Sequence, residues 1–336
     1  MNITKRTARK FIFPTLMKLG IDKFIRNSAK DAYLNLMYHG VVLKDGSYFS
    51  PRHITSDQFE SHLKYYRKNF DIISISEAFY NIRNNIKPKK KTITISFDDG
   101  YKNNFNVALT LLEKYNIPTT FFVSSVCTED MNLRCLWSDI IAALNYFYKD
   151  KVIQLSSYDF KNLFDKEKRV SITELFKSYT YDERERRLKE LINTYDLDTK
   201  IQSLPEELWK FMSPEEVIEL SQSDIVEIGS HGHLHYNLGE IEVEKAKEEL
   251  VKSKKLLESL LNKEVNLIAY PDGSYNDDIK NLSKEAGYKG QLAVNYKTIT
   301  DYKDKRIMNR YGLSSTTTYE SNMIFLNLAF QNKGVI

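Results

Sequence analysis

Two short runs of β-branched and aromatic residues, separated by one helical segment, constrain the fold of this 336-residue chain more than any other feature. The first run spans residues 92–97 (TITISF) and the second spans residues 119–124 (TTFFVS). Residues of these types favour buried strands, and the segment 104–115 between them predicts a helix. A strand–helix–strand unit connects parallel strands, so the sequence predicts an α/β protein built on a parallel sheet.

The same alternation of strands and helices continues along most of the chain. Further strands are predicted at residues 32–38, 225–228, 265–270 and 291–294, and further helices at 56–69, 76–84, 214–222, 240–261 and 277–286. About seven βα units on one sheet predict a barrel-like α/β domain, in which chemistry gathers at the C-terminal ends of the strands.

The strand signals stop between residues 130 and 212, where charged amphipathic stretches replace them. We therefore expect a helical insertion that lies beside the cleft and supplies no metal ligand. The expected division is a basic N-terminal helical segment (1–30), the first part of the barrel domain (31–129), the insertion (130–212), the second part of the barrel domain (213–318), and a C-terminal helix or tail (319–336).

The composition excludes several classes of protein. With 42% apolar and 28% charged residues, the chain is typical of a soluble globular protein. A net charge of +4 is too small to predict a nucleic-acid binder. The two cysteines, Cys127 and Cys135, match no zinc-knuckle spacing, and we expect free thiols in a reducing compartment. No apolar run reaches the ~18 residues of a transmembrane helix.

The first 30 residues interleave lysine and arginine with apolar side chains. No small-residue cleavage site follows the apolar stretch 11–21, so a secretory signal is not expected. Two interpretations stay open: a helix that lies on an anionic membrane surface, or a basic helix packed on the domain. The expected location is the cytoplasm, with peripheral contact at the inner membrane face under the first interpretation.

Reactive side chains follow three of the predicted strands. Asp98 and Asp99 come directly after the strand 92–97, and Gly100 allows a turn that brings both into one cleft. Two close carboxylates repel each other, so a cation or a shared proton is expected between them. The plain alternative is a turn in which the carboxylates cap a helix.

His231 and His235 follow the second of these strands and are four residues apart. That spacing places two imidazoles on one side of a helical turn and suits two zinc ligands, although Gly232 makes a tight loop equally consistent. His233 is expected to point away. One Asp and two His form a metal site that suits Zn²⁺, Fe²⁺, Co²⁺ or Ni²⁺. The second carboxylate can deprotonate the bound water, which is the apparatus of metal-assisted amide or ester hydrolysis.

The third strand is followed by Ala269-Tyr270-Pro271-Asp272-Gly273, whose backbone N–H groups could face a developing oxyanion. With this turn added, the motifs SFDDGYKNNFNVALTLLEKYNIPTTFFV, EIGSHGHLHYNL and AYPDGSYN resemble the polysaccharide deacetylase family (carbohydrate esterase family 4, NodB homology domain). The resemblance covers residues 31–126 and 213–318. It implies a distorted (β/α) barrel of the NodB type, and an enzyme that removes acetyl groups from glycans.

The resemblance also implies roles for individual residues. Asp98 would be the catalytic base, Asp99, His231 and His235 would hold a divalent metal ion, and the backbone N–H of Asp272 would complete the oxyanion hole. We also expect Trp137, Tyr270 and Pro271 to bind the sugar. For Trp137, a role as a core anchor is the alternative.

The chain departs from the family pattern in five places. Gly232 replaces a usual Ser or Thr, Ala269 replaces the usual Arg that steadies the base, and Asp272 replaces a usual aromatic residue. The C-terminal Leu-x-His that supplies the general acid is absent, because no histidine follows His235. A tryptophan-bearing motif has no clear match either.

A variant branch, similar to poly-N-acetylglucosamine deacetylases, accounts for most of these departures. Its members carry a Met-Tyr-His strand near the N-terminus, which Met37-Tyr38-His39 matches. Among the six histidines, His39 ends a buried strand, where barrel chemistry is expected, so we assign it as the general acid. We expect neighbouring carboxylates to keep it protonated near neutral pH. Arg310 is the candidate replacement for the missing arginine, with a surface charge as the alternative.

Together these features predict a bacterial, metal-dependent carbohydrate N-deacetylase of glycan biosynthesis, with zinc as the first choice of ion and an N-acetylated sugar or oligosaccharide as substrate. Two alternatives remain open. One is a hydrolase of a non-sugar C–N amide bond. The other is a glycan-binding pseudoenzyme that lost catalysis with Ala269, against which the intact Asp98, Asp99, His231 and His235 argue.

Overall fold

The computed structural model describes residues 12–46, 49–129, 135–313 and 315–331. At its centre lies a nine-stranded sheet whose paired strands are all parallel. In spatial order its strands are β14 (Ile307–Asn309), β13 (Gly290–Ala293), β12 (Leu267–Ala269), β11 (Val226–Ser230), β6 (Thr119–Val123), β5 (Thr92–Phe97), β1 (Tyr33–Tyr38) and β15 (Tyr311–Gly312), with β4 (Asp71–Ile72) paired to β5.

The two ends of this strand order are neighbours in the sequence. Strand β14 ends at Asn309 and strand β15 begins at Tyr311, so Arg310 alone connects one edge of the sheet to the other. The sheet therefore curls into a nearly closed barrel, and the predicted distorted (β/α) barrel is confirmed.

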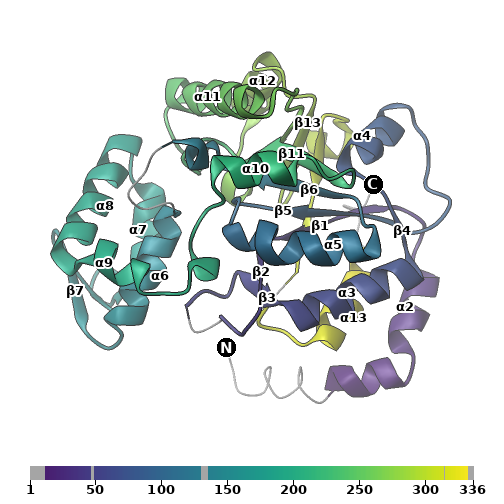
Figure 1. Ribbon diagram of the computed structural model, residues 1–336, viewed down its shortest axis with the longest axis horizontal. Coiled ribbons are helices and arrows are strands. Elements are labelled where there is room, and N and C mark those ends of the chain that lie inside the picture. The colour runs from purple at the N-terminus through teal and green to yellow at the C-terminus, as the bar shows by residue number, and fades with distance from the viewer. Residues whose placement is uncertain (1–11, 47–48, 130–134, 314, 332–336) are drawn as a thin grey trace.

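Helices cover the outside of the barrel (Figure 1). They are α3 (Ser56–Asn69), α4 (Ile75–Arg83), α5 (Thr110–Tyr115), α10 (Pro214–Leu220), α11 (Val243–Leu261), α12 (Asp277–Glu285) and α13 (Tyr319–Ala329). Because both faces of the strands are covered, β1, β5 and β6 are buried at every position. Residues 104–109, predicted as α-helix, instead form a π-helical turn that leads into α5.

Local sequence signals account for where several helices begin. At α10, Ser213 accepts a hydrogen bond from the backbone N–H of Glu216, and the Glu216 side chain accepts one from the N–H of Ser213. Pro214 occupies the first helical turn, where its missing N–H costs no hydrogen bond.

The segment predicted to be a helical insertion lies at the left of Figure 1. It contains helices α6 (Trp137–Phe147), α7 (Ile172–Ser178), α8 (Tyr181–Tyr195) and α9 (Leu197–Gln202). The segment is not wholly helical, because four short strands, β7 (Val152–Leu155), β8 (Tyr158–Lys161), β9 (Phe164–Asp165) and β10 (Val170–Ser171), form an antiparallel sheet. The central sheet in the described residues includes none of these strands, and the segment has its own apolar core around Trp137, Phe160 and Leu191.

The N-terminal segment is described from residue 12. Helix α2 (Ile21–Ser28) is held against the body by Asp22 and Arg26, which both hydrogen-bond to the hydroxyl of Tyr65 on α3. Leu19, which precedes α2, and Phe24, which lies in α2, are 71% and 72% exposed. No helix in the described part of the chain is long and apolar enough to cross a membrane. Contact with a membrane surface stays a prediction.

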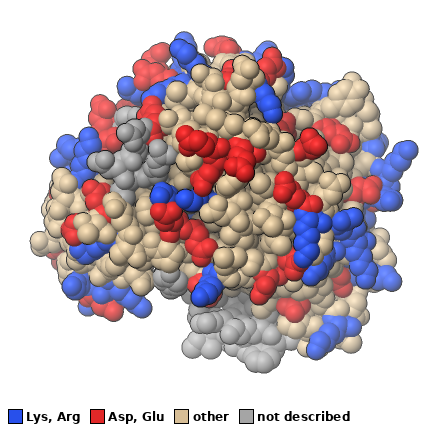
Figure 2. Space-filling view, in the orientation of Figure 1, with Lys and Arg blue, Asp and Glu red and all other residues tan. Residues whose placement is uncertain are grey.

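Both signs of charge are interspersed on the molecular face shown in Figure 2, in line with the net charge of +4. Cys127 and Cys135 are buried and are not joined in a disulfide.

Candidate active site

The candidate site lies at the C-terminal ends of three strands of the barrel. The C-terminal ends of parallel strands meet at one edge of a sheet, and β5, β11 and β12 all belong to this sheet. Asp98 and Asp99 follow β5, His231 follows β11, and Tyr270 follows β12. A cavity of about 370 Å³ opens at this edge, and Asp98, Asp99, His231 and His235 all line it.

Asp99, His231 and His235 converge. Oδ1 of Asp99 lies 3.4 Å from Nε2 of His231 and 3.2 Å from Nε2 of His235. One potential ligand atom from each residue lies within 4.8 Å of the other two. Nδ1 of His231 lies 2.8 Å from the carbonyl oxygen of Ala269, an arrangement that turns Nε2 towards the site and is typical of metal-binding histidines.

The donor set fits a divalent metal ion. Oδ1 of Asp99 is buried and has no hydrogen-bond partner among the described residues, although two imidazole nitrogens lie beside it. One carboxylate and two imidazoles are ligands that Zn²⁺ and its first-row neighbours accept, with further positions open.

The pKa values of this cluster indicate an ionised carboxylate. Burial raises the pKa of Asp99, but the hydrogen bonds and positive charge that the imidazoles can provide outweigh burial and hold the pKa well below 3.8. Burial lowers the pKa of His235, yet contact with Asp99 raises it above 6.5 overall.

Three residues of the site have left-handed backbone conformations that side chains rarely adopt. The φ angle is 76° at Asp99, 56° at His235 and 53° at Asp272. Such conformations cost about 1–3 kcal/mol each and cluster at functional sites. Gly232, with φ of 76°, has this conformation within the histidine loop, where a Ser or Thr would be strained. The loop is tight and not helical, which settles the alternative left open by the histidine spacing.

Asp98 is held by Arg310. Nη1 of Arg310 donates to Oδ1 of Asp98 at 2.5 Å, and Nη2 donates to Oδ2 at 2.8 Å. Burial raises the pKa of Asp98, but Arg310 and then His231 lower it by more, so the carboxyl pKa lies below 3.8. Arg310 is 4% exposed, which excludes the alternative of a surface charge.

His39 follows β1 and lines the same cavity as Asp98. Burial lowers its pKa by more than Asp99 and Asp98 raise it, so the pKa lies below 6.5. The expectation that neighbouring carboxylates keep His39 protonated near neutral pH is therefore wrong for this environment, because burial disfavours the charged imidazole. The other histidines lie elsewhere: His53 contacts the carbonyl of Leu208, His62 contacts Tyr38, and His233 contacts Ser125.

In the turn after β12, the backbone N–H of Asp272 takes no part in the hydrogen bonds that close the turn. The bonds that close the turn are donated by Gly273 to Tyr270 and by Ser274 to Pro271, and neither uses the N–H of Asp272. Asp272 and Tyr270 line the cavity, whereas Pro271 is buried and lies outside the lining. Trp137 lines the cavity and also stacks on Phe176, so it is both a wall residue and a core anchor.

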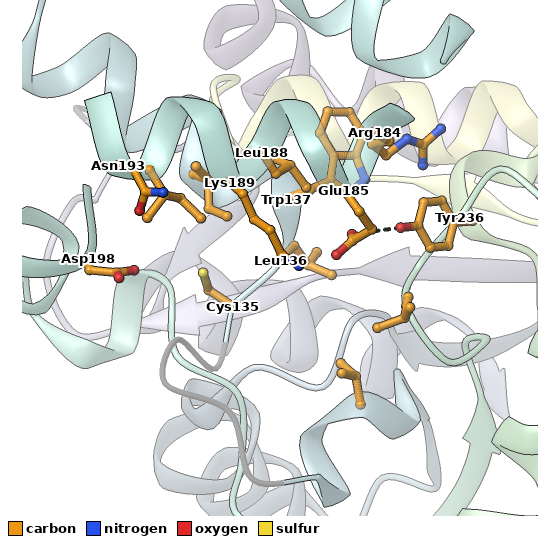
Figure 3. A pocket seen from close by; sticks show the side chains of 14 residues that line it. Cys135, Leu136, Trp137, Arg184, Glu185, Leu188, Lys189, Asn193, Asp198 and Tyr236 are labelled. Atoms are coloured by element: carbon orange, nitrogen blue, oxygen red, sulfur yellow. Dashed lines mark hydrogen bonds between the residues drawn. The ribbon is translucent and has the colours of Figure 1, made fainter. Parts of the chain in front are cut away.

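The insertion supplies one wall of the cavity but no member of the Asp-His-His cluster. Trp137 and Ser138 on α6 and Thr173 and Lys177 on α7 line the cavity. A second cavity, of about 380 Å³, shares Trp137 with the first (Figure 3). Its wall includes Arg184 and Glu185 of α8, and Glu185 accepts a hydrogen bond from the hydroxyl of Tyr236 (Figure 3).

Sequence reasoning missed a second aspartate–arginine pair beside the cavity. Arg52 lines the cavity and contacts the buried carboxylate of Asp139 on α6. Asp139 also accepts hydrogen bonds from the hydroxyl of Tyr101 and from the backbone N–H of Leu136. Burial raises the pKa of Asp139 to about 6, although Arg52 opposes the change. No motif marks this pair, because its members are 87 residues apart in sequence.

Glu249 on α11 was also missed. Its Oε2 accepts the backbone N–H groups of His233 and Leu234, both at 2.9 Å, and so fixes the loop that carries the two cavity-lining histidines. The sequence gives no signal of this contact, because Glu249 is one of several charged residues in an amphipathic helix.

Comparison with known proteins identifies the family. The family model for polysaccharide deacetylases matches residues 85–291. The match covers more than half of the chain, so the protein belongs to the polysaccharide deacetylase family. The family model is that of a polysaccharide deacetylase, so the chain carries a carbohydrate deacetylase domain.

The sequence identity between this chain and individual relatives is low. The protein is 32% identical to YxkH of Bacillus subtilis (strain 168) over 89 residues, which are 26% of this chain and 30% of that protein. The match therefore spans less than a third of the length of this relative.

Solved structures share the fold over most of their length. IcaB from Ammonifex degensii matches with a TM-score of 0.57 and 15% identity, over 90% of this chain and 99% of that one. The Streptococcus pyogenes deacetylase PplD in complex with acetate matches with a TM-score of 0.55 and 18% identity, over 87% and 98% of the two chains. A de-N-acetylase from Aggregatibacter actinomycetemcomitans matches with a TM-score of 0.56 and 19% identity, over 87% and 100%.

Proposed function

We propose that the protein is a metal-dependent hydrolase that removes N-acetyl groups from an amino-sugar-containing glycan or glycan precursor. The observation that carries this proposal is the arrangement of two adjacent carboxylates with different partners. Asp99 faces two imidazoles, whereas the neighbouring Asp98 is clamped by Arg310. One cavity would therefore hold a three-residue ligand set and a separate, ionised base.

Asp99, His231 and His235 would hold the ion. When bound, a divalent ion of this kind polarises a carbonyl and makes water more acidic. Zinc is the first choice, because its usual ligands are those present, and Fe²⁺, Co²⁺ and Ni²⁺ accept the same set.

Asp98 would accept the proton of the attacking water. Its low pKa keeps it ionised at neutral pH, and Arg310 holds both oxygens so that the carboxylate cannot turn away. The N–H of Asp272 would donate to the oxyanion that develops as the water oxygen bonds to the acetyl carbon.

In the fraction of the enzyme whose His39 imidazole is protonated, His39 would deliver the proton that the departing nitrogen requires, because an amide anion is a poor leaving group. Three imidazoles line the cavity, and His39 is the one outside the cluster around Asp99. The C–N bond then breaks to give acetate and the free amine. Trp137 and Tyr270 would form the apolar surface against which the sugar lies.

Acetate release tests the proposal. The protein is assayed on lipid-linked, nucleotide-linked and oligomeric N-acetyl sugars, with and without a chelator, and its metal content is measured. We expect acetate from at least one N-acetyl sugar, its loss after chelation, and its return with one divalent metal. Hydrolysis of a non-sugar amide alone, or bound glycan without acetate release, would favour the two alternatives.

His39→Ala tests the acid. An activated ester has a leaving group that needs little protonation, so its hydrolysis should persist, while amide cleavage should fall by about 10²–10⁴-fold. His53→Ala, which removes a buried histidine outside the cavity lining, is the matched control. Equal amide activity in the His39 variant and the wild type would remove His39 from the mechanism.

A further inference from the structure

Arg52 and Lys177 form a positively charged wall of the catalytic cavity. The charge of this wall is opposite to that of the proposed base, Asp98. Arg52 precedes β3 (His53–Thr55), and Lys177 lies in α7 of the insertion. Both side chains line the cavity with Asp98 and Asp99. The proposed deacetylation of a neutral acetamido group does not require either cation.

Arg52 is held rigidly and still has hydrogen-bond capacity. Its Nε donates to Ser50 at 3.1 Å, its Nη1 donates to Ser138, and its Nη2 contacts Asp139. A guanidinium carries five N–H groups, so these three contacts leave one N–H on each Nη. The side chain is 20% exposed, whereas that of Asp139 is fully buried. The pair therefore presents its positive member to the cavity.

Lys177 lies close to the same place. Its Nζ is 2.8 Å from Oδ2 of Asp272, in the turn that follows β12. The lysine side chain is 40% exposed and the aspartate side chain 34%, so the ion pair is open to solvent and can exchange partners. Arg52 and Asp272 line the same cavity, so both cations belong to the wall that contains this carboxylate.

A third cation lies behind this wall. Arg184 has no exposed surface, and its guanidinium lies 5.5 Å from the ring centre of Trp137 and 4.5 Å from that of Tyr236. Its Nε donates to the carbonyl of Phe176, but Nη1 and Nη2 have no hydrogen-bond partner among the described residues. This charge is not directly paired, so it adds to the positive potential on the Trp137 side of the cavity (Figure 3).

We propose that the substrate carries a phosphate group beside its N-acetyl sugar, and that Arg52 and Lys177 bind this phosphate in the catalytic cavity. The inference rests on the proposed deacetylase function and names its substrate class. A fixed guanidinium with two unused N–H groups matches the oxygens of a phosphate, and a mobile ammonium adds a second charge. The hydroxyls of Ser138 and Thr173 in the same wall can complete the hydrogen bonding.

The test compares two substrates that differ only in charge: an N-acetylhexosamine 1-phosphate and the methyl glycoside of the same sugar. We expect the wild type to favour the phosphate about tenfold or more in kcat/KM, the effect of one charge-assisted contact. In Lys177→Gln and in Arg52→Gln the ratio of the two kcat/KM values should fall by about tenfold. Arg186→Gln, which removes an exposed arginine that pairs with Glu183 on α8, should leave the ratio unchanged.

The outcomes separate this inference from the proposed function. Acetate release from both substrates with no preference for the phosphate would overturn the inference and leave the deacetylase proposal standing. Loss of acetate release from both would overturn the deacetylase proposal. The inference would then be decided by calorimetric titration with the same sugar phosphate, which Lys177→Gln should weaken about tenfold and which an unchanged affinity would contradict.

Arg52→Gln leaves Asp139 without its partner, so if that variant does not fold, the comparison of Lys177→Gln with Arg186→Gln decides. Two further substrates distinguish the source of the phosphate. A nucleotide-diphosphate N-acetyl sugar and a prenyl-diphosphate N-acetyl sugar are compared, and the higher kcat/KM identifies a soluble or a lipid-linked substrate.

Discussion

Two aspartate–arginine pairs, each with a buried carboxylate, lie beside one cavity, and they present opposite charges to it. In the barrel, Asp98 lines the cavity and Arg310 lies behind it, whereas at the insertion Arg52 lines the cavity and Asp139 lies behind. Their pKa values also diverge. Burial opposes ionisation in both, but the pKa of Asp98 is lowered below 3.8, and that of Asp139 is raised to about 6.

The difference comes from how each arginine is used. Arg310 donates to both oxygens of Asp98, and His231 adds positive charge nearby. Arg52 divides its donors among Asp139, Ser138 and Ser50, and Asp99 adds negative charge near Asp139. The same two residue types therefore give a permanently ionised base in one place and a cation directed at the cavity in the other.

The largest effect among the tests of this comparison is expected when the base, Asp98, is substituted. Asp98→Asn removes the proton acceptor but keeps a similar shape, so kcat should fall by about 10²–10⁴-fold while metal content is unchanged. Asp57→Asn, at an exposed position in the first turn of α3, is the control. Near-normal turnover in the Asp98 variant would make Asp98 a structural residue.

The next test replaces the arginine of each pair. Arg310 and His231 lower the pKa of Asp98, whereas burial raises the pKa of Asp139 to about 6, so at pH 7 a proton neutralises Asp139 more readily than Asp98. Arg310→Met should therefore lower the free energy of unfolding by about 3–5 kcal/mol, and Arg52→Met by clearly less. Urea unfolding at pH 7 measures both, and equal losses would contradict the difference between the pairs.

The smallest effect concerns pH. The folded-state pKa of Asp139 is about 6 and its ordinary value is 3.8, so the folded protein binds more protons between these values. This group's contribution to stability is therefore greatest below pH 4, and about 3 kcal/mol of it is lost as the pH rises to about 6. In Asp139→Asn the free energy of unfolding should fall less steeply between pH 4 and 6. Identical slopes for variant and wild type would place the Asp139 pKa near its ordinary value.

The sequence predicted the parts of the site that lie next to strands. Asp98, Asp99, His231 and His235 follow strongly apolar runs, and alternating strands and helices bring such ends together, so the barrel and the cluster could both be inferred. The four strands of the insertion were not predicted from the sequence, because they are only two to four residues long. In β7 and β8, exposed and buried positions also alternate among charged neighbours.

The partners of the site residues could not be inferred in the same way. The contact between Asp139 and Arg52 depends on how the insertion packs on the barrel, and that of Glu249 depends on the rotation of α11. Neither packing nor rotation has a local sequence signal. The pKa of His39 was misjudged because the two carboxylates were visible in the sequence, whereas the degree of burial was not.

The position of Arg310 links catalysis to the order of folding. Arg310 is the single residue between β14 and β15, the strands at the two ends of the spatial order. It contacts Asp98 across 212 residues of sequence. Contacts this distant in sequence close a long loop and form late in folding. A chain whose barrel is still open has the base without its arginine, so recovery of activity after dilution from denaturant would report closure of the barrel rather than formation of its individual helices and strands.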